Sequence, residues 1–306
     1  MDCPLRRFSC LLLLVTLGFA GCSSSTPPAQ PTPKPLPAGT YSYQLNVANI
    51  RALDSESGQY VLWLRMRGDT AWFAKQLTYW TVGAGSLDFL GIIALPHMPD
   101  SIERAFVAIE PPHIPDSPTS ILMAGAFDSI GDSASMSTVN EGGVGDYSKA
   151  RASVIFTTQS TDTNRAKSEF YLMDVIGGVP SSSVSNLPIP PQGWNYGLWV
   201  LDSNFYPLHK FFYGAFAKAD SSDSKSRNDE FPFPGGFNPA PLTDPGARLE
   251  VTLEPNFAVQ SNHPNGPSPF IILWTPLRRF IDYNDTLNLR NVWSTSAPHG
   301  ILKLSK

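Results

Sequence analysis

The chain alternates short apolar runs with polar breaks, and the runs have the length and period of β-strands rather than helices. The clearest runs of the first part are rich in β-branched and aromatic residues and span 41–47, 60–66, 104–110, 120–127 and 152–158. Prolines lie in many of the connections, where they end strand pairing. This pattern predicts an all-β fold, as a β-sandwich or a barrel.

The same series of strands recurs further along the chain. Four segments, YSYQLNV at 41, YVLWL at 60, VAIEP at 107 and PDSPTSILM at 115, have partners in the same order: FYLMDVI at 170, YGLWV at 196, VTLEP at 251 and PNGPSPFII at 264. In the first pair, Tyr43, Leu45 and Val47 match Tyr171, Met173 and Val175. The growing offset between partners is what insertions in loops produce. We therefore predict two tandem homologous β-sandwich domains, 39–162 and 163–306.

One correspondence is polar as well as apolar, since three charged positions are matched in the two copies. They are Asp100, Arg104 and Glu110 in the first copy, and Asp244, Arg248 and Glu254 in the second. Each glutamate is held at a strand end by the proline that follows it. One interpretation is a carboxylate site in each domain. The interpretation that we favour is structural, an ion pair or a hydrogen bond to a turn, because half-exposed pairs usually just set geometry.

The N-terminus carries a targeting signal. Two arginines precede an apolar stretch at 8–20, which is too short for a typical membrane span. The stretch ends in FAGC at 19–22, which resembles the bacterial lipobox, with Phe19 where leucine is usual. This resemblance implies a signal peptide over 1–21 and a lipid on Cys22. The alternative is an ordinary secretory signal followed by an incidental cysteine.

The segment that follows supports an anchor. Residues 22–38 are rich in proline and serine, cannot bury a core, and form a stiff tether of roughly 3.1 Å per residue. A lipid at Cys22 and this tether predict attachment to a membrane of the bacterial envelope. Ser23 does not resemble the aspartate of an inner-membrane retention signal, so the outer membrane is favoured. The other cysteines, Cys3 and Cys10, lie in the signal peptide, so no disulfide is expected.

Composition and motifs restrict the chemistry. The net charge is −4, and no basic stripe argues for nucleic acid. The chain has no GxSxG, HExxH, P-loop or GxGxxG motif, and its histidines are scattered. We therefore expect no enzyme, no cofactor and no metal site. The alternatives are an envelope glycan hydrolase that uses paired carboxylates, and a sensor that signals through a membrane partner.

Both copies resemble the extracytoplasmic C-terminal domain of anti-sigma-K factors. In the first copy the resemblance lies in YVLWL at 60–64, VAIEP at 107–111 and the segment at 121–125 that ends in Ala-Gly. In the second copy it lies at 196–200 and 251–255, with Leu273-Trp274 in place of the final Ala-Gly. It implies a compact β-sandwich outside the cytoplasm. Sigma-factor inhibition is not implied, because the sigma-binding domain and the transmembrane helix of that family have no counterpart. We expect a non-enzymatic envelope lipoprotein that binds, scaffolds or senses, with an envelope protein or glycan as partner.

The two copies differ most in the loop after the LW strand of the second. This loop brings aromatic residues beside proline and glycine, and the predicted partner contacts are Tyr206, Phe231, Phe233 and Phe237. The alternative is that these rings cover the open end of their own sandwich.

Overall fold

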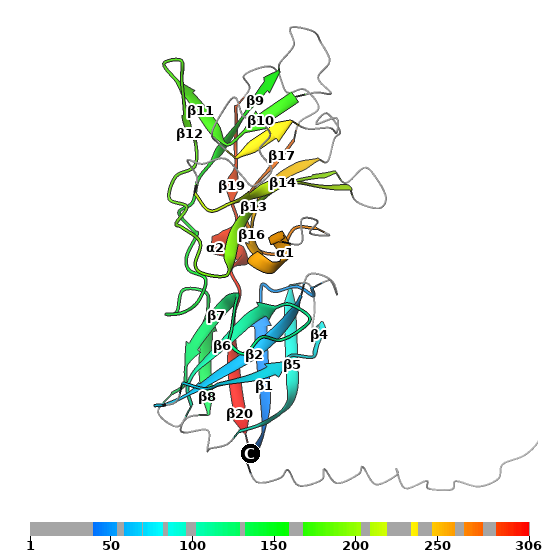
Figure 1. Cartoon of the computed structure of the whole chain (residues 1–306), viewed down its shortest axis with the longest axis vertical. Helices are drawn as coiled ribbons and strands as arrows, with labels where there is room; N and C mark the ends of the chain where they lie inside the picture. The colour runs from blue at the N-terminus through cyan, green and yellow to red at the C-terminus, as the bar shows by residue number, and fades with distance from the viewer. Residues whose placement is uncertain are drawn as a thin grey trace, which may run out of the picture. The chain divides into compact units, whose positions relative to one another are not determined.

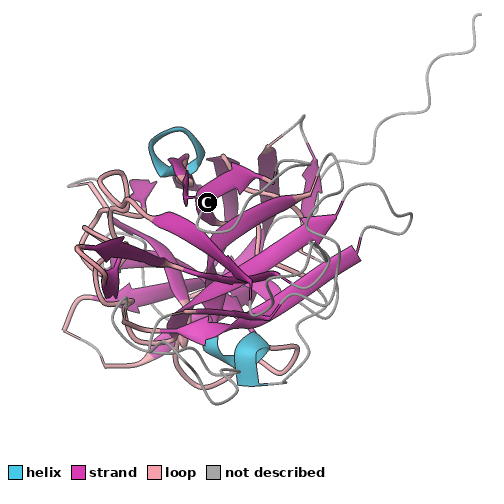
Figure 2. Ribbon diagram, turned by 90° about the horizontal axis from the view of Figure 1, so that it is seen from above, coloured by secondary structure: helices cyan, strands magenta, loops and turns pink. Residues whose placement is uncertain are grey.

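The computed structural model describes most of the chain between Gly39 and Ser305. The described residues are 39–53, 58–68, 70–81, 85–95, 102–128, 132–158, 168–202, 209–218, 234–237, 247–260, 266–277 and 286–305. Strands make up most of this part, with two short helices among them (Figures 1 and 2). The all-β prediction is confirmed. No helix among the described residues is both long and apolar enough to span a membrane.

Nine antiparallel strands form one sheet, which we name the first module. Their order across the sheet is β3-β2-β6-β7-β8-β20-β1-β5-β4. The strands are β1 (Thr40–Ala48), β2 (Gln59–Met66), β3 (Trp72–Gln76), β4 (Tyr79–Thr81), β5 (Ser86–Ala94), β6 (Ile102–Glu110), β7 (Ile121–Ala126), β8 (Ser133–Ser137) and β20 (His299–Ser305). Alternate side chains such as Tyr43, Leu45 and Val47 enter the core, as the period of two predicts.

The remaining strands form the second module. It has a sheet of order β14-β13-β16-β17-β19, a sheet of order β15-β10-β9-β18, and the β11–β12 hairpin. The elements are β9 (Ser153–Thr158), β10 (Ser168–Tyr171), β11 (Met173–Ile176), β12 (Val179–Ser182), β13 (Trp194–Asp202), β14 (His209–Phe216), β15 (Gly235–Phe237), β16 (Arg248–Pro255), α1 (Asn256–Gln260), β17 (Ile271–Pro276), β18 (Thr286–Asn288), β19 (Arg290–Asn291) and α2 (Trp293–Ser296). β18 belongs to the sheet that contains β9, and β19 belongs to the sheet that contains β17. Only Leu289 separates these two short strands, so this stretch of chain joins the two sheets.

The modules exchange one strand each. β9 follows β8 in the chain but pairs with β10 and β18 of the second module. β20 follows the second module but lies between β8 and β1 of the first, where Leu302 faces Leu45 and Ala134 (Figure 1). The predicted boundary at 162/163 is therefore corrected, since β9 and β10 pair across it. The hydrophobic pattern identifies a strand, but it does not show to which sheet the strand belongs.

With this exchange, the two modules share one strand order. The series β3-β2-β6-β7 corresponds to β14-β13-β16-β17, and β8-β20-β1-β5 corresponds to β18/β19-β9-β10-β15. The register agrees as well, because Tyr60 faces Ile109 just as Tyr196 faces Leu253. Each module also has a register shift directly after the valine of VAIEP or VTLEP. The matched phrases of the sequence thus occupy matching places in the two modules.

One matched pair is shifted by a residue. Tyr43 points into the main core, and its predicted partner Tyr171 does not. Phe170 and Leu172 point there instead, while Tyr171 belongs to a separate small cluster. The match of Tyr43 to Tyr171 is therefore wrong. A slip of one residue moves every side chain of a strand to the opposite face.

Two connections carry the chain from one module to the other, at 138–152 and 292–298. Tyr147 of the first connection and Trp293 of the second are fully buried, and their rings meet edge to face with centroids 4.9 Å apart. Asn291 donates from Nδ2 to the carbonyl oxygens of Tyr147 (2.7 Å) and Ala150 (2.8 Å). These contacts hold the two crossing segments together, and one buried apolar cluster includes residues of both modules.

Candidate functional site

The repeated glutamates lie at matching strand ends. Glu110 accepts hydrogen bonds from Trp63 Nε1 (3.2 Å), from the backbone N–H of Thr119 (2.9 Å) and from the Thr119 hydroxyl. Burial raises the pKa of Glu110, while these bonds oppose the shift. The carboxylate therefore ties the end of β6 to the turn that leads into β7.

Glu254 repeats the arrangement in the second module. It accepts from Trp199 Nε1 (3.0 Å), the Ser268 backbone N–H (2.9 Å) and the Thr252 hydroxyl (2.5 Å). Burial raises the pKa of Glu254 to about 7, and the three bonds oppose the shift. Both carboxylates are enclosed by protein, so they act as hydrogen-bonded links between a strand and a turn.

The repeated arginines do not meet these glutamates. Arg104 forms an ion pair with Glu141, and Arg248 Nε lies 2.6 Å from Glu250 Oε1. Arg104 and Glu110 stand at opposite ends of β6, six residues apart, and at about 3.3 Å per residue that separation is roughly 20 Å. Of the two structural alternatives, the ion pair within each repeat is therefore wrong, and the hydrogen bond to a turn is the one that Glu110 and Glu254 form.

Other predicted site residues lie outside the described residues. They are Cys22, Asp100, Tyr206, Phe231, Phe233 and Asp244. Phe237 belongs to β15, and its side chain is likewise outside the described part. The lipid anchor and the aromatic contact surface therefore stay predictions.

The outer face of the first module, opposite its main core, is closed by apolar side chains. Its buried cluster consists of Val61, Trp63, Phe106, Ala108 and Ala124. Trp72 meets the rings of both Trp63 and Phe106 edge to face. A Cβ atom on Gly142 would lie 2.9 Å from the Phe106 ring, so the first connection passes directly over this ring. The described side chains at this place pack against one another.

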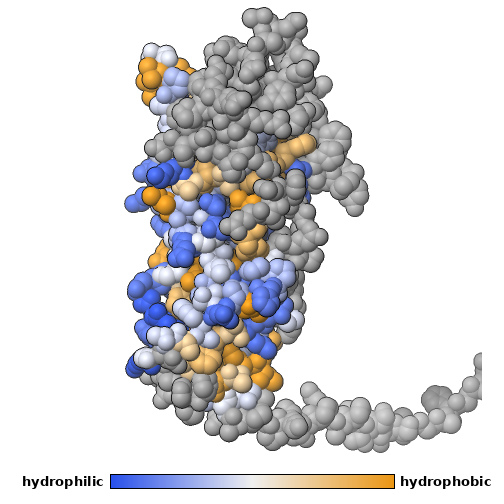
Figure 3. Space-filling model, viewed as in Figure 1, coloured by the Kyte–Doolittle hydropathy of each residue, from blue (hydrophilic) through white to orange (hydrophobic). Residues whose placement is uncertain are grey.

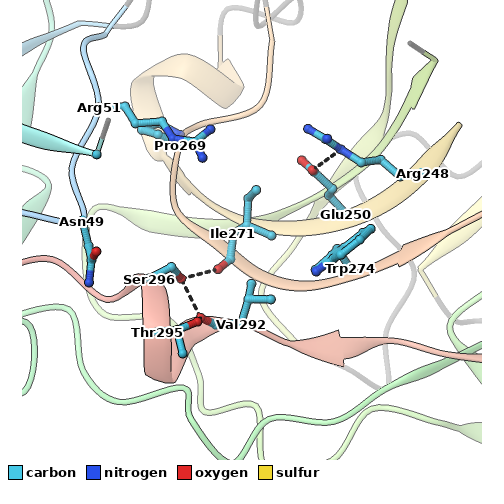
Figure 4. Close-up of a pocket in the computed structure, with 11 residues that line it drawn as sticks. Asn49, Arg51, Arg248, Glu250, Pro269, Ile271, Trp274, Val292, Thr295 and Ser296 are labelled. Carbon is cyan, nitrogen blue, oxygen red and sulfur yellow. Dashed lines mark hydrogen bonds and ion pairs between the residues drawn. The ribbon is translucent and has the colours of Figure 1, made fainter. Parts of the chain in front are cut away.

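The corresponding row of the second module contains a charged residue. By register, Glu250 stands between Trp199 and Trp274 on the two neighbouring strands, where the first module has Phe106 between Trp63 and Ala124. A groove of about 380 Å³ opens here (Figure 4). Its walls include Arg51, Arg248, Glu250, Ile271, Trp274 and Ser296. An adjoining hollow of about 180 Å³ shares both arginines and Glu250.

Arg51 reaches this groove from the first module. It follows β1 through Asn49, which has a positive φ of 57° and donates from Nδ2 to the carbonyl of Ala297 (3.2 Å). Asparagine tolerates this left-handed conformation better than most residues. Ile50 donates its N–H to the carbonyl of Gly85 (3.0 Å). The segment that carries Arg51 is thereby fixed at both the first module and the second connection.

The charges of the groove are unequal. Glu250 is only 2% exposed, and burial raises its pKa, with Arg248 and then Arg51 opposing the shift. The Arg248 side chain is 44% exposed, and Figure 4 shows its guanidinium and that of Arg51 extending toward one another. Among the described residues that line the groove, two guanidiniums against one carboxylate give an excess of positive charge. Such groups hold a negatively charged ligand through paired N–H bonds.

A second surface lies on the β11–β12 hairpin. Val175, Ile176 and Val179 are 47%, 72% and 65% exposed and form an apolar tip, the projection at the upper left of Figure 3. Gly177 and Gly178, both with positive φ, make its two-residue turn. The tip offers contact area but no polar chemistry, so the groove is the stronger candidate site.

Sequence reasoning missed Arg51, Glu250 and Trp274. Trp274 was within reach, because Leu273-Trp274 departs from the Ala-Gly of the first copy. Glu250 replaces Phe106 at the matched offset, so comparing the two copies position by position on their outer faces would have found it. Arg51 gave no such signal, because it comes to the groove from the other module.

Within the described ranges, no three side chains of His, Cys, Asp and Glu lie close enough together to hold a metal ion. Comparison of the chain with protein-family models, curated proteins and solved structures gave no match.

Proposed function

We propose that this chain is a non-enzymatic lipoprotein of the bacterial envelope that binds a ligand in the groove beside Trp274. One observation carries the binding role. The same framework is built twice, and only the second copy replaces its apolar outer row by a charged and open one. Burying a carboxylate costs free energy unless the carboxylate is paired. The presence of Glu250 where the first module has phenylalanine therefore needs a functional explanation.

The groove has the properties of a small-molecule site. Its volume lies within the usual range of about 300–1,000 Å³, and its walls combine an aromatic ring with a few charged and hydroxyl groups. Arg248 and Trp274 project from paired strands, which supply a rigid base. The ion pair with Glu250 fixes the guanidinium of Arg248 before a ligand arrives.

The place of action follows from the sequence. The lipobox-like FAGC with Cys22, and the tether over 22–38, support a lipid-anchored protein of the envelope, with the outer membrane favoured. The likeness of YVLWL and VAIEP to anti-sigma-K factors supports an extracytoplasmic domain that binds, scaffolds or senses. An envelope protein or glycan is the partner that we propose.

A glycan hydrolase is the competing function. Such enzymes use two carboxylates about 5–9.5 Å apart. Glu250 is the one acidic side chain among the described residues that line the groove. The capture experiment with envelope material therefore measures bond cleavage as well as binding.

The test uses the mature, lipidated protein as bait for detergent-solubilised envelope and for enzymatically released envelope glycans. We expect the parent and an Arg67→Gln control, changed at an exposed turn outside the groove, to capture the same material. The double variant Arg51→Gln/Trp274→Ala should lose it while keeping its melting temperature. Capture unchanged in the double variant contradicts binding in the groove, and new reducing ends released from the glycans favour the hydrolase.

The anchor is tested separately. Cells that express the parent or Cys22→Ser are labelled with a palmitate analogue and fractionated. We expect label and membrane sedimentation for the parent alone. A Cys22→Ser form that is labelled and sediments like the parent rules out lipidation at this residue.

A further inference from the structure

We infer that the groove takes a carbohydrate that carries a carboxylate, and this inference rests on the proposed binding function. The groove has a donor side, an aromatic wall and an acceptor side, and an acidic sugar has a complementary group for each of them.

The donor side consists of Arg51 and Arg248. Guanidinium N–H groups point outward in a planar fork that matches the two oxygens of a carboxylate. Arg248 donates its Nε–H to Glu250. The terminal N–H groups of Arg248 are then available to a ligand. The single negative charge of Glu250 reduces the excess positive charge to one, and this excess favours a monoanion over a phosphate dianion.

The aromatic wall is Trp274. Its ring is half-buried on the outer face of β17, beside Glu250 on β16. The face of an indole ring is electron-rich, so it attracts the weakly positive C–H groups on one side of a pyranose ring. A free inorganic anion has no such face, and Trp274 therefore favours a sugar over phosphate alone.

The acceptor side comes from the second connection and the end of β1. The Ser296 hydroxyl donates to the carbonyl of Val292 (2.8 Å), and the Thr295 hydroxyl donates to the same carbonyl (3.0 Å), as Figure 4 shows around α2. Asn49 donates one of its two amide N–H groups to the carbonyl of Ala297, and its Oδ1 is an acceptor. The two hydroxyls, whose protons are used inside the protein, and this amide oxygen present lone pairs, which are the partners that sugar hydroxyls need.

The test is calorimetric titration of the mature full-length protein in detergent with two matched disaccharides. Cellobiouronic acid and cellobiose differ by a single carboxylate in place of a hydroxymethyl group. We expect the acid to bind at least about tenfold more tightly, as a charged hydrogen-bonded pair supplies. Arg51→Gln should lower the affinity for the acid to that for cellobiose, Arg51→Lys should have an intermediate effect, and Trp274→Ala should weaken both sugars.

The controls separate this inference from the broader function. Arg67→Gln should bind both sugars like the parent, and inorganic phosphate should compete poorly. Equal affinity for acid and neutral sugar, or phosphate competing as well as the acid, overturns the acidic sugar. If neither sugar binds but the groove variants still lose capture of envelope material, the inference fails and the binding function stands. If the groove variants keep that capture, both fail.

Discussion

Across three neighbouring strands, the first module carries Trp63, Phe106 and Ala124 on its outer face, and the second carries Trp199, Glu250 and Trp274. The rows occupy the same places in the same register. The core-facing positions stay apolar in both modules, because each must bury a core to fold. The outer row is therefore where one framework can serve two purposes, packing in one copy and, as we propose, recognition in the other.

The connections explain how the two rows can differ. After β8, residues 138–152 form a long connection, and part of this connection covers Phe106. After β19, the connection comprises only residues 292–298 before β20 begins. The shorter connection lines one side of the groove through Ser296 instead of covering it.

The largest expected effect comes from removing the strand exchange. A chain that ends at residue 298 leaves β1 and β8 without their shared partner and removes Leu302 and Leu304 from the core. We expect hydrogen-exchange protection to be lost throughout the first module, and a peptide of residues 299–305 to restore it.

Single substitutions in β20 provide the control. Leu302→Ala should lower the free energy of unfolding by about 2–5 kcal/mol, and Ile301→Ser, on the exposed side of the same strand, by less than about 0.5 kcal/mol. Full protection of the first module in the shortened chain would mean that β20 is dispensable.

The second expected effect comes from exchanging the outer rows. Phe106→Glu places an unpaired carboxylate in a closed apolar cluster and should cost about 4 kcal/mol or more in chemical denaturation. Glu250→Phe removes a buried charge and should change stability by about 1 kcal/mol or less. Costs of similar size in the two modules would show that their outer faces are equivalent after all.

The third effect distinguishes the two arginines. Arg248→Gln strips a buried carboxylate of its partner and should cost about 2 kcal/mol, less than a fully buried pair because Arg248 is half exposed. Arg104→Gln breaks a pair whose carboxylate, Glu141, is in solvent, and should leave the unfolding midpoint almost unchanged. Thermal and urea unfolding of both variants measure the two losses of stability. Equal losses would mean that the Arg248–Glu250 and Arg104–Glu141 pairs contribute equally to stability.

The effect that is smallest per pH unit is a pH dependence of stability. The pKa of Glu254 is raised from 4.5 to about 7 by folding, so the folded state holds the extra proton between these values. Its contribution to stability is complete below pH 4.5 and is lost as pH rises through 7, at most about 1.4 kcal/mol per pH unit. Glu254→Gln should flatten this slope in urea titrations. Glu110→Gln should do so less, and an unchanged slope in Glu254→Gln contradicts the assignment.

Strand positions and the repeat were accessible from the sequence because both are local. Alternation along YVLWL or VAIEP shows which side chains are buried, and proline marks the ends. The exchange of β9 and β20 was not accessible, because Val154 and Leu302 are equally apolar and either strand fits either sheet. A hydrogen bond from each strand-end glutamate to a turn was one of the predicted alternatives, but the turn residues Thr119 and Ser268 were not identified, because no pattern fixes the geometry of those turns.

The position of β20 has a consequence for how the protein is made. Synthesis proceeds from the N-terminus, so β1 and β8 emerge long before the strand that lies between them. Until residues 299–305 arrive, both strands present open edges that can pair with other chains. A module that is first in the sequence is thus last to close. A nascent chain therefore stays dependent on holding factors, and sensitive to premature termination, until its final strand is delivered.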